Sequence, residues 1–101
     1  MIAQTILQQI GGRRFSTMTN SKNFIDLGNG LQMSLAKNKT QANRLKIILD
    51  GSADTYTMRF YRQAVTKTFD IKVKEIAHYE LVYCDMLEEI FTSGTGLYTR
   101  F

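Results

Sequence analysis

Residues 45–61 decide how this chain folds, and they read LKIILDGSADTYTMRFY. Apolar side chains recur at every second position in residues 45–49 and again in residues 54–61. Because successive side chains of a β-strand point to opposite faces, each of these segments suits a strand with one buried face. The residues between them, 50–52, favour tight turns. The stretch therefore predicts a β-hairpin.

The same period of two continues on both sides of this hairpin. The turn at residues 28–30 separates residues 24–27 from residues 31–35, and this pattern predicts a second hairpin. On the other side, apolar and charged residues alternate in residues 69–74 and predict another strand, after an irregular stretch at 62–68. We expect an antiparallel sheet of four or five strands.

Helical spacing of apolar residues marks both ends of the chain. Residues 2–10 predict a short helix that ends at the glycine pair 11–12, since helices often close on glycine. Residues 13–18 suit a strand instead. Residues 79–91 predict an amphipathic helix that ends at Gly94 and can cover the sheet. The apolar face of that helix carries Tyr83, Met86, Leu87, Ile90 and Phe91.

The predicted fold is a single α+β domain over residues 1–101. In it, the C-terminal amphipathic helix and the short N-terminal helix pack on one face of the antiparallel sheet. Burying that face stabilises the fold by roughly 1.5–3 kcal/mol for each large apolar side chain, before conformational entropy is subtracted. The residues expected in the core are Leu31, Met33, Leu35, Leu45, Ile47, Leu49, Tyr56, Met58, Phe60, Phe69, Ile71 and Val73.

The composition, 44% hydrophobic and 22% charged, is that of a folded protein. Cys84 is the one cysteine, so no internal disulfide can form and a reducing compartment fits best. We expect no signal peptide and no membrane span, and hence a cytoplasmic location. Residues 1–50 hold seven basic and two acidic groups, which gives this half of the chain a charge of +5 and would suit an anionic partner.

Candidate catalytic residues are few. The one histidine, His78, is expected before the C-terminal helix and Cys84 within it, so a Cys–His pair is not expected. Asp85, Glu88 and Glu89 are expected on the solvent side of that helix, where acidic residues are normally found. Without a histidine they would form only a weak metal site. We expect no enzymatic activity, no metal and no cofactor.

Arg13 and Arg14 follow the glycine pair 11–12. Phosphate-binding loops place glycines before a helix, so that backbone N–H groups converge on the anion. Here the glycines follow a predicted helix, as do those of residues 93–96, which also lack the lysine of a P-loop. Both segments are interpreted as helix ends, but Arg13 and Arg14 are kept as candidates for phosphate contact.

The outward face of the predicted sheet carries the main candidate site. If alternate residues face the helices, the opposite face is basic, with one aromatic and one large aliphatic side chain among the charges. Its cations can bind phosphates while Tyr61 stacks on a base, as in single-stranded nucleic-acid binding. An ordinary solvent-exposed sheet face would explain the same pattern. The residues of this face are Arg44, Lys46, Ile48, Arg59, Tyr61, Lys72 and Lys74.

A protein interface is the alternative for the same face. Ile48 and Tyr61 would form an exposed apolar pair, which often marks an interaction surface. A second copy of the chain or another protein would bury this pair, and Tyr98 and Phe101 near the C-terminus would add to the contact. Nucleic acid, a protein partner and a homodimer are therefore all open, and no membrane association is expected.

Short segments spread from about Phe15 onward share a pattern of hydrophobic positions and turns. They comprise residues 22–24, 31–35, 43–47, 54–56, 90–92 and 95–99, with Tyr83, Asp85 and Leu87. The pattern resembles a group of bacteriophage and prophage proteins of about this length. The resemblance implies an accessory protein of the bacterial cytoplasm that acts on phage or host nucleic acid or inhibits a host defence protein. A protein partner would then be a host or phage protein. It transfers no site residue to this chain.

Overall fold

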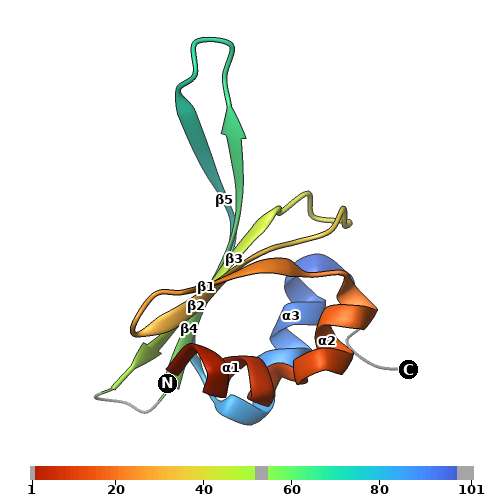
Figure 1. Ribbon diagram of the computed structural model, residues 1–101, viewed down its shortest axis with the longest axis vertical. Helices are drawn as coiled ribbons and strands as arrows, with labels where there is room; N and C mark the ends of the chain where they lie inside the picture. Colours follow the sequence, from red (N-terminus) through yellow and green to blue (C-terminus); the bar gives the residue numbers. More distant parts are fainter. Residues whose placement is uncertain (1, 52–54, 98–101) are drawn as a thin grey trace.

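The computed structural model describes residues 2–51 and 55–97, which form two layers (Figure 1). One layer is a five-stranded antiparallel sheet whose strands lie in chain order, β1-β2-β3-β4-β5. The other consists of three helices on one face of that sheet. This arrangement confirms the α+β fold expected from the sequence. The elements are α1 (Ile2–Ile10), α2 (Gly12–Thr19), β1 (Lys22–Asp26), β2 (Gly30–Ser34), β3 (Arg44–Asp50), β4 (Thr55–Val65), β5 (Ile71–Val82), a 3₁₀ turn η1 (Cys84–Met86) and α3 (Leu87–Thr95).

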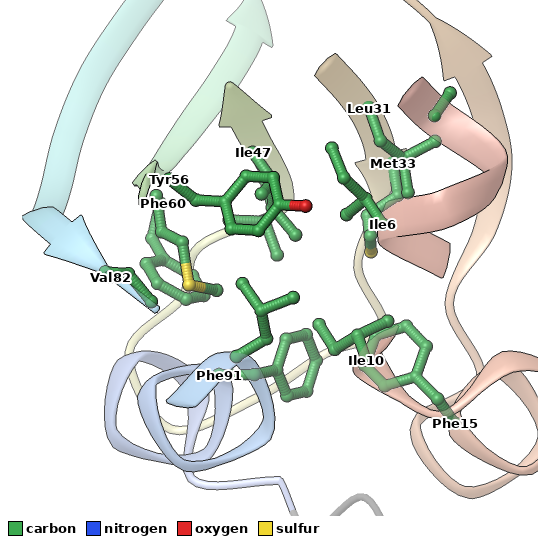
Figure 2. Close-up of a cluster of buried hydrophobic side chains, with 14 of the residues drawn as sticks. Ile6, Ile10, Phe15, Leu31, Met33, Ile47, Tyr56, Phe60, Val82 and Phe91 are labelled. Atoms are coloured by element: carbon green, nitrogen blue, oxygen red, sulfur yellow. The ribbon is translucent and has the colours of Figure 1, made fainter. Parts of the chain in front are cut away.

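The core lies between the helices and part of the sheet (Figure 2). Phe15 of α2 and Phe91 of α3 meet edge to face with ring centroids 4.8 Å apart, and Phe60 of β4 lies 6.2 Å from Phe91. Ile6 and Ile10 of α1 are fully buried in the same cluster. Because a helix of nine residues is marginal by itself, this burial is what stabilises α1.

Gly94 allows α3 to approach β4 closely. A Cβ at this position would lie 2.6 Å from two ring carbons of Phe60, which is too short for a carbon contact. Glycine inside a helix costs about 1 kcal/mol relative to alanine, and the close approach explains why it is present here. The helix runs one residue further than expected, to Thr95. It is closed by Gly96 (φ 78°), whose N–H donates to Thr92 O.

We expect Gly94→Ala to lower the free energy of unfolding by roughly 1–3 kcal/mol, because the added methyl group overpacks against Phe60. Urea denaturation followed by circular dichroism measures this loss. Gly51→Ala is the matched control, since Gly51 is exposed and a Cβ there would meet no atom of the described residues within 4 Å. A Gly94→Ala variant as stable as the wild type would contradict the close packing of α3 on β4.

Residues 13–18, expected to form a strand, form most of the helix α2. Phe15 and Thr19 are four residues apart and therefore share one helix face, where both are buried. The Thr19 hydroxyl donates to Phe15 O at 2.8 Å, so its polar atom is satisfied inside the core. Gly11 and Gly12 have positive φ angles, 127° and 58°, and link the two helices. The glycine pair thus ends α1 and also begins α2.

β5 runs to Val82 and includes residues 79–82, which the sequence pattern assigned to the C-terminal helix. Val82 pairs with Tyr56 of β4 and is buried. The helix α3 begins only at Leu87, after the 3₁₀ turn, and Tyr83 is consequently exposed rather than in the core. Apolar residues at this junction fit either period, and pairing with β4 decides in favour of the strand.

β4 and β5 extend beyond the rest of the sheet as a two-stranded arm, residues 62–74, which is prominent in Figure 1. The expected irregular stretch at 62–68 is therefore partly strand. At the base of the arm, Asn43 continues the pairing of β3 with its side chain. Its Nδ2 donates to Gln63 O and its Oδ1 accepts from Gln63 N–H, both at 2.8 Å. Further along the arm, the described pairs join β4 to β5 alone.

The apolar residues of the arm do not reach the core, because the helices do not extend over it (Figure 1). Ile71 is 63% exposed, Val73 is 60% exposed and Phe69 is almost fully exposed, so the expectation that these three are buried is wrong. The alternation correctly predicted a strand, but it did not indicate that the helices leave this part of the strand uncovered. The remaining expected core residues are buried or half-buried: Leu31, Met33, Leu35, Leu45, Ile47, Leu49, Tyr56, Met58 and Phe60.

A register shift in β5 decides which face of the sheet each arm residue occupies. Phe60 pairs with Ala77, but the next residue, Tyr61, pairs with Glu75, so Ile76 is an extra residue in β5. Because of this one inserted residue, the side chains of residues 71–75 lie on the opposite face from the one that regular alternation from Ala77 would give. We call the face that carries Phe60 the helix face and the face that carries Tyr61 the open face.

Candidate functional site

The open face brings together five of the residues expected to form the site. Lys46 pairs with Arg59, and Arg44 pairs with Tyr61, across β3 and β4. Ile48 lies two residues from Lys46 on the same side of β3. The sequence pattern therefore located this group of residues correctly in space.

The structure separates Lys72 and Lys74 from that group, which corrects the expectation that all seven share one face. Lys74 pairs with Arg62 and Lys72 pairs with Ala64, and both partners belong to the helix face. The physical reason is the extra residue Ile76, which reverses the alternation of the arm. The open face receives the apolar residues of this part of β5 instead.

The ring of Tyr61 is not free to stack on a base. Its side chain is only 8% exposed, and Lys46 Nζ lies over the ring at 5.6 Å from the centroid. Burial raises the pKa of the Tyr61 hydroxyl, against the opposing effect of Arg44 and Arg59. Tyr61 therefore supports the side chains above it rather than presenting a flat surface to a ligand.

The open face is also less basic than the sequence suggests. Arg59 Nε donates to Glu75 Oε1 at 3.1 Å, and His78 Nδ1 lies 3.5 Å from the same oxygen. This carboxylate offsets part of the positive charge. The hollow on this face measures about 190 Å³ and is lined by Gln32, Lys46, Arg59, Tyr61, Gln63 and Val73.

Arg13 and Arg14, the candidates for phosphate contact, are exposed on α2. Arg14 Nη2 lies 3.7 Å from Glu88 Oε1 of α3. The same oxygen would be 3.0 Å from a Cβ at Gly11, so the glycine pair faces a carboxylate. A phosphate at this position would be repelled, and the surroundings of α2 therefore favour an ion pair over an anion site.

His78 and Cys84 lie in different elements, β5 and η1, and Cys84 is exposed. His78 is flanked by carboxylates, with its Nε2 3.5 Å from Glu80 Oε1. Within residues 2–51 and 55–97, no three His, Cys, Asp or Glu side chains are grouped so that they could hold a metal ion. Over the same residues, no helix has the length and apolar character needed to cross a membrane.

A second basic surface, which the sequence pattern did not reveal, lies on the helix face of the arm. Arg62 and Lys74 stand opposite each other on β4 and β5, and Lys72 lies two residues further along. A cleft of about 620 Å³ is lined by Arg62 and by the loop that precedes β3, which carries Lys37 and Lys39. We call these five residues the basic arm face.

Hydrogen bonds hold the loop of residues 35–43 in place. Asn38 Nδ2 donates to Ala36 O at 2.8 Å and to Ala42 O at 2.7 Å. Asn38 Oδ1 accepts from Thr40 N–H, and the Thr40 hydroxyl donates to Gly94 O of α3 at 2.8 Å. The lysines of this loop therefore extend from a backbone that is anchored to the helix layer.

All five side chains of the basic arm face are exposed. Within the described part of the chain, none of its five side chains forms an ion pair. Arg62 Nη1 donates to Gln41 O at 3.0 Å, which orients the guanidinium toward the cleft. A cluster of exposed cations on an ordered backbone attracts anionic partners. The clustering depends on the register of β5 and on the fold of a loop, and so it has no local signal in the sequence.

The tip of the arm is a tight, hydrogen-bonded turn. Thr66 N–H donates to Asp70 O at 2.8 Å and Phe69 N–H donates to Thr66 O at 2.9 Å. The Thr68 hydroxyl donates to the Asp70 carboxylate at 2.9 Å. Phe69 occupies the left-handed region (φ 65°), which costs a bulky residue on the order of 1–3 kcal/mol, and its side chain is 86% exposed.

Comparison of the chain with models of protein families, with curated proteins and with solved structures gives no match. The function is therefore inferred from the surfaces of this chain itself. The arm and the adjoining cleft are the described surfaces whose chemistry is not explained by folding.

Tyr61 leads to a prediction about alkaline stability. Its pKa is raised in the folded protein, so the unfolded chain loses this proton first, near the ordinary value of 10.0. The folded state then holds more protons than the unfolded state, and the free energy of unfolding falls as the pH rises above about 10. We expect Tyr61→Phe to reduce this fall, measured by urea denaturation at a series of alkaline pH values. Tyr83→Phe, at an exposed tyrosine, is the control, and equal pH dependence in all three proteins would contradict the prediction.

Proposed function

We propose that this protein is a non-enzymatic module that binds nucleic acid through its basic arm face. One observation carries the proposal: five cations line an uncovered arm and the cleft beside it, without a described ion pair. Nucleic acid is also a partner expected from the sequence. The surface proposed here differs, because the sequence pattern predicted contact through the outward face of the sheet.

The shape of the arm supports this proposal. Proteins that bind DNA with β-strands insert them into the major or the minor groove of the duplex. Alternate residues of a strand lie roughly 7 Å apart, so Lys72 and Lys74 can contact different phosphates while Arg62 contacts a third from β4. Lys37 and Lys39 extend the contact across the cleft. Contacts of this kind bind the backbone of the nucleic acid and position the protein on it.

The proposal is tested with the triple variant Arg62→Gln/Lys72→Gln/Lys74→Gln and a labelled DNA duplex of about 20–30 base pairs. Each neutralised phosphate releases counterions, so the logarithm of the association constant falls with log salt by about 0.9 for each contact. We expect the triple variant to reduce the magnitude of this slope by about 2–3 and to weaken binding at low salt at least tenfold. Fluorescence anisotropy at several salt concentrations measures both effects.

A matched control removes three cations from the open face, in Arg44→Gln/Lys46→Gln/Arg59→Gln. We expect a smaller effect, because Arg59 is already paired with Glu75. Equal weakening by the two triple variants would show that the charge attraction is diffuse and would contradict the assignment to the arm. Absence of binding by the wild type at low salt would overturn nucleic-acid binding altogether.

The open face of the arm favours a second function, self-association. Val65, Ile71 and Val73 lie together on this face and are each 60–65% exposed. Adjacent exposed apolar side chains are typical of a surface that another protein covers. A second copy of the chain offers the same apolar row, and two such rows are self-complementary.

The interface residues expected from the sequence are less exposed than this apolar row. Ile48 is half-buried and Tyr61 is buried, so they do not form an exposed apolar pair. Tyr98 and Phe101 lie outside the described residues.

Light scattering over a range of protein concentrations tests the second proposal. We expect a dimer that persists in high salt, because apolar contacts are not screened. Ile71→Thr/Val73→Thr keeps β-branched residues and should weaken dimerisation at least tenfold, whereas Ile25→Thr, at an exposed position of β1, should not. A monomer at every concentration would rule out self-association.

A further inference from the structure

Phe69 combines properties that the fold does not require. Its ring is 86% exposed, so it adds no packing to the described core. Its φ of 65° is a conformation that glycine or asparagine adopts at lower cost. A residue kept in an unfavourable conformation without a packing role is a candidate for contact with a partner.

The turn around Phe69 is rigid enough to direct the ring. The two backbone hydrogen bonds between Thr66 and the residues Phe69 and Asp70 close the turn. Side-chain bonds add to them, because the Thr68 hydroxyl donates to the Asp70 carboxylate and Asp70 N–H donates to Thr66 Oγ1. The phenyl ring therefore projects from a preorganised tip, and little order has to be gained on binding.

We propose that Phe69 inserts between neighbouring base pairs of duplex DNA and bends the duplex when the basic arm face is bound. This inference rests on the proposed function. Phenylalanine is one of the apolar side chains that unstack base steps in this way. The cations needed beside such a wedge are present, with Lys67 in the same turn and Lys72 on the adjoining strand.

A double-stranded partner fits the tip better than a single strand. Surfaces that bind single strands stack successive bases on several aromatic rings along a basic groove. The arm carries one aromatic residue, Phe69, and the nearest ring along β4, Tyr61, is buried beneath Lys46. A single ring at the end of a projecting arm suits one base step.

Two measurable properties are expected of such a wedge. Inserted side chains of this kind bend DNA by about 20–90°. Flexible pyrimidine–purine steps and mismatched pairs unstack more easily than A-tracts, so they should be bound more tightly. We expect at least a fivefold preference for a duplex with a central mismatch over an A-tract of the same length.

The experiment measures energy transfer between dyes at the two ends of a duplex of about 30 base pairs, together with binding by anisotropy. Phe69→Asn removes the ring and suits the left-handed conformation, whereas Phe69→Leu keeps an apolar wedge. We expect the wild type and Phe69→Leu to shorten the end-to-end distance. Phe69→Asn should bind with the same salt slope, without bending the duplex and without preferring the mismatch. Because strain is removed, it should also raise the Tm by about 4 °C or more.

Each outcome decides a separate question. Salt-dependent binding by the wild type without bending would overturn the wedge and leave the basic arm face standing. Bending that survives in Phe69→Asn would also overturn it, as would a lower Tm in that variant, because the ring would then have a role in the fold. Both proposals would be supported if Arg62→Gln/Lys72→Gln/Lys74→Gln binds DNA more weakly but still bends it at saturating protein, while Phe69→Asn binds without bending. No binding by the wild type would overturn both.

Discussion

The limited reach of the helices is the constraint on which the rest of this structure depends. α1 and α3 have nine residues each and are roughly 14 Å long. β4 and β5 have 11 and 12 residues and span roughly 36–40 Å. The helix layer therefore covers only part of the two longest strands. The covered part becomes the core, with Phe60 at its centre, and the uncovered part becomes the arm.

An uncovered two-stranded segment must be stabilised by its own pairing and by its base. Asn43 stabilises the base of the arm, because its amide group bonds to the backbone N–H and C=O of Gln63 just before β3 begins. The register shift at Ile76 then gives the arm two chemically different faces. Lysines lie on the helix face of the arm and branched apolar residues lie on its open face. A regular strand would have exchanged them.

Local patterns in the sequence predicted most of the fold. The hairpins at 24–35 and 45–61 and the first helix follow from periodicity and turn residues, which act over a few neighbours. The errors all involve contacts between distant segments. Residues 13–18 are helical because Phe15 meets Phe91, and residues 79–82 are a strand because they pair with β4. Ile71 and Val73 are exposed because no helix lies over them.

The candidate site also depends in part on contacts between distant segments. Five residues of the open face could be grouped by alternation, but the basic arm face depends on one inserted residue and on a folded loop, and neither has a periodic signal.

The irregularities of β5 also bear on how the protein behaves at high concentration. β5 is one of the two outer strands of the sheet, and a long, regular outer strand is a template for joining sheets into fibrils. Its register shifts twice against β4, at Ile76 and between Tyr79 and Val82, where Leu81 takes a positive φ of 55°. A strand interrupted at these two points cannot offer an unbroken row of N–H and C=O groups to another chain. The insertion that places lysines on one side of the arm therefore also makes β5 a poorer template for another strand.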